Sequence, residues 1–190
     1  LAVIFYGSCL REAKLDGLML DFYVIVSDYD AAYRKAGKPR WMAWANRTIP
    51  PNVFPAAHQG LAAKYAVLST DDLAKACSMS ASDVSVWARF AQPVRLAWVA
   101  GDAARHKVEA SLAEAPVTLL RHAAPLLPSG DNDPLAAWRL GFARTYGAEL
   151  RAERGDRPDK VVDFDPDFYR RIGQAVRAQH PDIGDADPAG

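Results

Sequence analysis

The sequence predicts an α+β fold, in which a mixed sheet with flanking helices is followed by a mainly helical carboxyl-terminal part. Short apolar runs rich in Val, Ile, Phe and Tyr occupy residues 1–6 and 18–26, a pattern typical of buried strands. From residue 102 onward the chain shows helical periodicity with few breakers. A cluster of turn-forming residues at 128–134 then separates the α/β front from the helical back.

This turn cluster predicts a boundary between an α/β domain at 1–128 and a helical domain at 129–180. Residues 181–190 are acidic and rich in Pro and Gly, so we expect a disordered tail there. The chain has 190 residues, half of them apolar, which is enough to bury a core. Its formal net charge is zero, whereas nucleic-acid binding usually brings a basic bias, so we expect no nucleic-acid partner.

Local signals place the elements in order along the chain. Ser27 and Asp28 offer capping side chains for a helix over 28–37, which Gly37 ends. Residues 48–60 are proline-rich and predict an irregular connection at the surface. The remaining expected elements are a strand at 61–68, helices at 69–77 and 80–91, a strand at 94–99, helices at 102–112, 116–126 and 135–154, a short extension at 161–164 and a last helix at 165–179.

The chemistry-bearing residues gather in the first 28 positions. Gly7 ends the first apolar run and lets the chain turn sharply, and Ser8 adds a hydroxyl and a backbone N–H that can cradle a phosphate. The other interpretation of this pair is a tight turn with no ligand. Asp21 interrupts an apolar strand, so its carboxylate must be desolvated, paired or bound to a metal. Asp28 is either a second metal ligand or a helix cap.

Gly7-Ser8, followed by twelve residues and then Asp21-Phe22, resembles the signature of the polymerase-beta-like nucleotidyltransferase superfamily. The usual second acid, two positions on, is Tyr23 here. Four ordered blocks resemble more narrowly the mitochondrial-type phosphatidate cytidylyltransferases, the translocator assembly and maintenance family. The blocks are Tyr6-Gly7-Ser8 with Met19-Leu20-Asp21-Phe22 and Val26-x-Asp28, then Lys64–Thr70, Ala88–Val94 and Tyr146–Arg151.

The resemblance implies a nucleotidyltransferase-like fold and transfer of a cytidylyl group from CTP to phosphatidic acid, with Mg²⁺ or another divalent metal as cofactor. It implies catalytic roles for Asp21, Ser8 and Gly7. Asp21 is the expected primary metal ligand, and Asp28 and Glu149 are candidate partners. It also implies a peripheral location on the inner membrane, cytoplasmic in a bacterium or facing the matrix in a mitochondrion.

Two large anions meeting in one site require cations. The candidates for the triphosphate and the lipid phosphate are Lys64, Arg89, Arg144 and Arg151, each of which is alternatively a solvated surface charge. The second pKa of a phosphate monoester lies near ~6, so this nucleophile is largely ionised at neutral pH and requires no general base. The tyrosine at position 23 agrees with such an acceptor.

Trp41 and Trp44 lie among basic residues at 34–47. Tryptophan beside Lys and Arg is typical of a membrane interface with anionic lipid. The alternative is a helix whose tryptophans fill the core. Two further hypotheses for the whole chain stay open: a nucleotidyltransferase with a small-molecule or protein acceptor, and a non-catalytic module that binds nucleotide or lipid.

Overall fold

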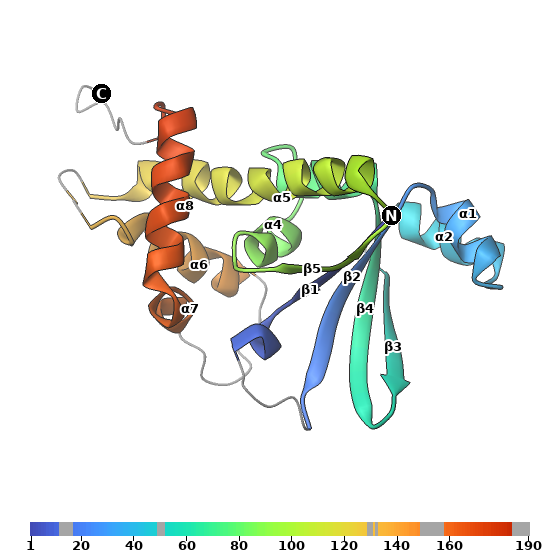
Figure 1. The fold of residues 1–190 in the computed structure, drawn as a ribbon. Coiled ribbons are helices and arrows are strands. Elements are labelled where there is room, and N and C mark those ends of the chain that lie inside the picture. Colours follow the sequence, from blue (N-terminus) through green and yellow to red (C-terminus); the bar gives the residue numbers. More distant parts are fainter. Residues whose placement is uncertain (12–16, 49–51, 129–130, 132, 149–157, 184–190) are drawn as a thin grey trace. The chain divides into compact units, whose positions relative to one another are not determined.

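The computed structural model describes residues 1–11, 17–48, 52–128, 131, 133–148 and 158–183. It is an α+β structure with a mixed five-stranded sheet, flanking helices and a helical carboxyl-terminal part, as the sequence predicts (Figure 1). The described strands have the order β3-β4-β2-β1-β5, and among them only the β2–β4 pair is parallel. The strands are β1 (Ala2–Tyr6), β2 (Met19–Val26), β3 (Asn52–His58), β4 (Leu61–Ser69) and β5 (Arg95–Val99).

The helices follow the sequence signals closely in most places. Asp28 accepts a hydrogen bond from Ala31 N–H and caps α1, and Asp165 caps α8 in the same way through Phe168 N–H. The α-helices are α1 (Tyr29–Lys35), α2 (Arg40–Thr48), α3 (Thr70–Cys77), α4 (Ser85–Phe90), α5 (Asp102–Ala123), α6 (Ala136–Ala148), α7 (Pro158–Phe164) and α8 (Pro166–Gln179), and the 3-10 turns are η1 (Ser8–Arg11) and η2 (Ala124–Leu126).

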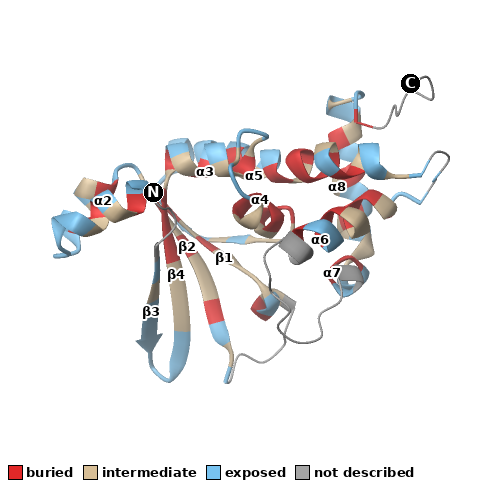
Figure 2. Cartoon of the chain, turned by 180° about the vertical axis from the view of Figure 1, so that it is seen from behind, coloured by how far each residue is buried: buried red, intermediate tan, exposed pale blue. Residues whose placement is uncertain are grey.

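The chain forms two compact units. The first comprises Leu1–Lys75 and Pro93–Ser111, and it contains the whole sheet. The second comprises Ala76–Gln92 and Leu112–Gly190. The domain division at residue 128 stays a prediction. In the second unit Trp138 packs against Phe142 and Tyr169, with ring centroids 6.4 and 5.2 Å apart. Figure 2 shows buried positions along α5 and α6.

The proline-rich segment was expected to be irregular, and this expectation is wrong for 52–58. These residues form β3, which pairs antiparallel with β4 and places Pro55 opposite Lys64. Proline is tolerated there because β3 is at the edge of the sheet, where the missing N–H removes no ladder bond when it faces away from the neighbour. Edge position therefore overrides the turn signal of the prolines.

Two helix predictions also need correction. Residues 102–123 form the single helix α5, although a break before Pro116 was expected. Burial of Ala115, Val117 and Leu119 on this stretch offsets the ~3 kcal/mol that an interior proline costs a helix. Residues 161–164, expected to be extended, lie in α7, where Val161 and Val162 are buried.

At the carboxyl end, residues 181–183 form a turn, and Arg121 is 3.0 Å from Asp182. Residues 184–190, which complete the predicted disordered tail, lie outside the described residues.

Helices α1 and α2 pack on one face of the sheet. Tyr29, Tyr33, Ala43 and Val67 form a buried cluster there. Tyr33 Oη donates to Asn46 Oδ1 at 2.8 Å, and Asn46 Nδ2 donates to the Val67 carbonyl at 2.9 Å. Since Asn46 is fully buried, this chain of hydrogen bonds fixes which side of α2 faces the sheet.

A second, partly buried network joins α1 to the start of α3. Tyr29 Oη donates to Asp72 Oδ2 at 2.5 Å and accepts from Ser69 N–H at 2.9 Å. Burial, with the Asp72 carboxylate as a further cause, raises the pKa of Tyr29 to about 12. The phenol therefore stays protonated at neutral pH and remains a donor to Asp72.

Candidate functional site

The turn after β1 depends on the backbone of Gly7. Its φ of +92° is a conformation that L side chains rarely adopt, which explains glycine at this position. Its carbonyl accepts from Leu10 N–H at 3.2 Å, and Ser8 follows it at the start of η1, exposed to solvent. A sharp bend and an exposed hydroxyl therefore lie together at the end of β1.

Asp21 lies directly beside this bend. It is the register partner of Tyr6 in the β1–β2 pair, so both residues are on the same face of the sheet. A Cβ placed on Gly7 would lie 3.0 Å from Asp21 Oδ2. The Asp21 side chain is 18% exposed, which leaves an opening to solvent. The juxtaposition of a glycine-serine bend with a largely buried carboxylate, predicted from spacing, is thus present.

Lys64 is the third member of this group. It is the partner of Asp21 in the parallel β2–β4 pair, and its Nζ lies 3.2 Å from Asp21 Oδ1. This contact is an ion pair without hydrogen-bond geometry, because Asp21 Oδ1 is buried and has no hydrogen-bond partner among the described residues. The Lys64 side chain is 42% exposed, so its ammonium group reaches solvent while it neutralises the carboxylate.

Asp21 Oδ1 lacks a hydrogen bond and is the carboxylate oxygen that could bind a metal, but it is buried and ion-paired with Lys64, so a metal would have to compete with that ammonium group. Mg²⁺ retains several waters and needs only one or two protein carboxylates when phosphate oxygens complete its shell. A single aspartate beside an open bend fits that requirement. Within the described residues no group of three His, Cys, Asp or Glu side chains could hold a metal by itself.

Asp28, the candidate second ligand, does not join Asp21. The five residue-to-residue steps from Asp21 to Val26 alone span about 16 Å of strand. Asp28 Oδ1 accepts from Ala31 N–H at 2.8 Å, and its Oδ2 is 3.1 Å from Arg47 Nη2. The hydrogen bond from Ala31, and secondarily Arg47, lowers the pKa of Asp28. The helix-cap role is the one this geometry supports.

The other predicted residues either belong to the second unit or lie outside the described residues. Arg89 is on α4 in the second unit, where its guanidinium donates to the Ser85 carbonyl. Arg144 is on α6, also in the second unit, and borders a cavity. Glu149 and Arg151 lie outside the described residues. The sheet therefore brings together Gly7, Ser8, Asp21 and Lys64.

Trp41 and Trp44 are not core residues. They are 66% and 68% exposed on α2, whose opposite side carries the buried Ala43 and Asn46. Figure 2 shows buried and exposed positions on this helix. Five exposed cations lie in this helix or in the residues before it, at Arg34, Lys35, Lys38, Arg40 and Arg47, and Arg47 is paired with Asp28 and Asp30. Among the described residues, no helix is both long enough and apolar enough to cross a membrane.

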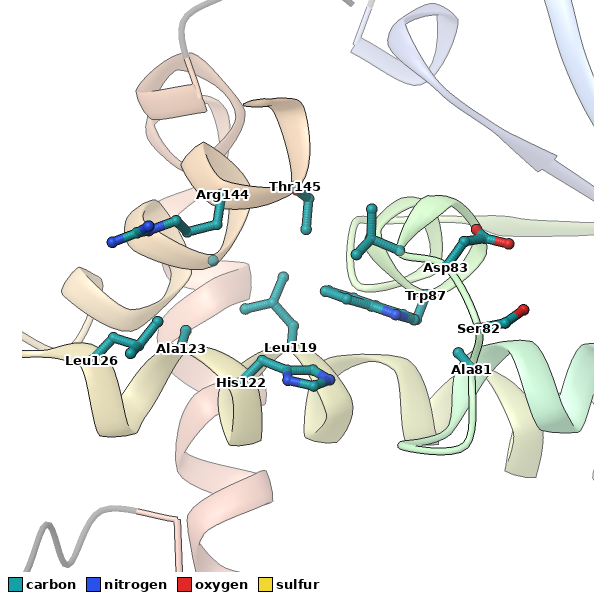
Figure 3. Close-up of a pocket in the computed structure, with 12 residues that line it drawn as sticks. Ala81, Ser82, Asp83, Trp87, Leu119, His122, Ala123, Leu126, Arg144 and Thr145 are labelled. Carbon is teal, nitrogen blue, oxygen red and sulfur yellow. The ribbon is translucent and has the colours of Figure 1, made fainter. Parts of the chain in front are cut away.

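Sequence reasoning missed a cavity of about 350 Å³ in the second unit (Figure 3). Its lining comes from residues 81–87, 119–126 and 141–145, three stretches whose proximity no local pattern reveals. It includes His122, whose ring stacks on Trp87 at a centroid distance of 5.5 Å.

Comparison with known proteins gave no match: no protein-family model and none of the curated proteins matches the chain.

Proposed function

We propose that this chain is a nucleotidyltransferase, and in particular a phosphatidate cytidylyltransferase that converts CTP and phosphatidic acid into CDP-diacylglycerol and pyrophosphate. The observation that carries the proposal is the contact of the Asp21 carboxylate with the Gly7 bend, with Lys64 as its ion-pair partner. The resemblance of the sequence blocks supplies the substrates. We also assign the mixed sheet to the nucleotidyltransferase fold.

The proposed reaction is an in-line displacement. A phosphate oxygen of phosphatidic acid attacks the α-phosphorus of CTP, and the bond from that phosphorus to the bridging oxygen breaks as pyrophosphate leaves. A bound divalent cation, most simply Mg²⁺ held by Asp21, would offset the negative charge of the phosphates. The backbone at Gly7 and Ser8 would approach the triphosphate closely, and Lys64 would supply a point positive charge to it.

The proposed reaction requires no general base from the protein, because the acceptor is a phosphate group. The acceptor phosphate is already ionised at neutral pH, because its second pKa lies near ~6. The position two residues after Asp21 holds Tyr23, which is buried and belongs to the same sheet face. A hydroxyl acceptor would instead require proton removal during attack.

The exposed tryptophans support the lipid as acceptor. On α2, two indole rings point to solvent beside several cations, a combination suited to the headgroup region of an anionic bilayer. We therefore propose a peripheral protein at the inner membrane, on its cytoplasmic side in a bacterium or its matrix side in a mitochondrion.

The test is transfer of label from each of the four NTPs, labelled at the α-phosphate, to vesicles containing phosphatidic acid, with Mg²⁺ or with EDTA. We expect lipid-soluble label from CTP alone, and none with EDTA. Asp21→Asn should abolish transfer, whereas the matched control Asp167→Asn, on the exposed side of α8, should not change it.

Two results would replace the proposal. Label on a water-soluble or protein acceptor would favour a nucleotidyltransferase of different acceptor. CTP binding without transfer to any acceptor would favour a non-catalytic module.

A further inference from the structure

The cavity in the second unit is formed within that unit alone. Its floor is α5, and the loop before α4, α4 itself and α6 complete the walls (Figure 3). Its volume of about 350 Å³ lies at the low end of the ~300–1,000 Å³ typical of ligand pockets. The lining residues are Ala81, Ser82, Asp83, Val84, Trp87, Leu119, His122, Ala123, Leu126, Gly141, Arg144 and Thr145.

The inner wall is apolar and well packed. Leu119 is fully buried, and Trp87 and Ala123 are almost so. A Cβ on Gly141 would lie 2.6 Å from Leu119 Cδ2, so α5 and α6 are in close contact at this point. An interior of this kind favours a hydrocarbon group over water.

The polar side chains at the rim differ in whether they already make hydrogen bonds within the protein. The Asp83 carboxylate accepts from Ser85 N–H at 2.8 Å, and the Thr145 hydroxyl donates to the Phe142 carbonyl at 2.9 Å. Arg144 is exposed and, within the described part of the chain, makes no hydrogen bond or ion pair. In Figure 3, Arg144 and Leu126 border one side of the cavity, and Trp87 and Asp83 border the other.

We propose that this cavity binds a small single-chain amphiphile with one anionic headgroup, a carboxylate or a phosphate. The chain would lie against Leu119, Ala123 and Trp87, and the headgroup would accept from the Arg144 guanidinium, which suits both anions. The modest volume selects one short chain rather than two. This cavity shares no lining residue with the group around Asp21, and the proposal does not depend on nucleotidyl transfer.

Binding is tested by calorimetric titration of the full chain with octanoate, octyl phosphate, octanol and inorganic phosphate. We expect saturable binding of at least one of the two anionic amphiphiles, and the comparison of the two identifies the headgroup. Octanol and inorganic phosphate should bind at least tenfold more weakly. Octanol lacks the anionic headgroup, and inorganic phosphate lacks the hydrocarbon chain. Equal binding of octanol, or equal binding of phosphate alone, would overturn the proposal.

Three variants locate the site. Arg144→Gln should weaken the anionic amphiphile at least tenfold, and Ala81→Phe, which fills the rim from a half-buried loop position, should abolish binding. Arg171→Gln, an exposed arginine on α8, is the matched control and should bind normally. Circular dichroism checks that each variant is folded. Full affinity in a folded Ala81→Phe protein would contradict the assignment, as would equal losses in the Arg144 and Arg171 variants.

Discussion

The Asp21 carboxylate occupies the space that a side chain at residue 7 would need, since its Oδ2 lies 3.0 Å from the Cβ position of Gly7. The positive φ of residue 7 and the lack of room for a Cβ therefore both favour glycine at this position. The strand pairing produces this contact, because Asp21 is opposite Tyr6, the residue before the bend.

Gly7→Ala should lower transfer at least tenfold and destabilise the fold by roughly 1–3 kcal/mol, since it adds backbone strain and pushes Asp21 away. The transfer assay with labelled CTP and urea unfolding measure the two effects. Gly60→Ala is the control, because its φ is +81° but nothing lies within 4 Å of its Cβ position. Equal losses of transfer in both variants would show that the contact with Asp21 is irrelevant.

Lys64→Met should increase the affinity of the free protein for Mn²⁺, because the ammonium 3.2 Å from Asp21 Oδ1 competes with a metal for that oxygen. The same change should lower transfer, since it removes a cation for the triphosphate. Titration followed by electron paramagnetic resonance of free Mn²⁺ measures the affinity. Lys107→Met is the control: it removes the exposed ion pair with Asp71 and should leave the Mn²⁺ affinity unchanged. Weaker Mn²⁺ binding by Lys64→Met would contradict the competition.

Replacing both Trp41 and Trp44 by Ala should weaken binding to anionic vesicles at least tenfold, because two exposed indoles no longer enter the interface. Stability should change by less than about 0.5 kcal/mol, as expected for exposed positions. Vesicle sedimentation and urea unfolding are the measurements. Trp98→Ala, an exposed tryptophan on β5, is the control. Comparable loss from Trp98→Ala would mean that α2 has no special role.

The stability that Asp28 contributes should depend on pH in a defined direction. Its pKa is lowered in the folded protein, so the contribution is complete above the unfolded value of about 3.8 and disappears as the pH falls through the lower folded value. The difference in unfolding free energy between the natural chain and Asp28→Asn should therefore be larger at pH 7 than at pH 2.5. A constant difference across this range would remove Asp28 as a charged cap.

The candidate site was predictable because it depends on neighbouring strands. Gly7 and Asp21 flank one short connection, so antiparallel pairing of β1 with β2 was enough to bring them together. Lys64 is 43 residues from Asp21, and residue spacing alone did not predict their pairing, which depends on the parallel register of β2 with β4.

Other features depended on context that local patterns do not contain. The prolines before residue 60 indicate a loop, and only the edge position of β3 permits a strand. The orientation of α2 depends on Asn46, a polar residue buried by two specific hydrogen bonds, which turns Trp41 and Trp44 outward. The cavity brings together residues from three α-helices, the 3-10 turn η2 and one loop, and none of them carries a recognisable motif.

Pro55 also affects whether copies of the protein can associate through the edge strand β3. β3 is an edge strand and exposes Val53, so a strand from another molecule could pair with it. Pro55, in the middle of β3, supplies no N–H for such an added strand. The residue that made this segment look like a loop therefore acts against fibrous self-assembly.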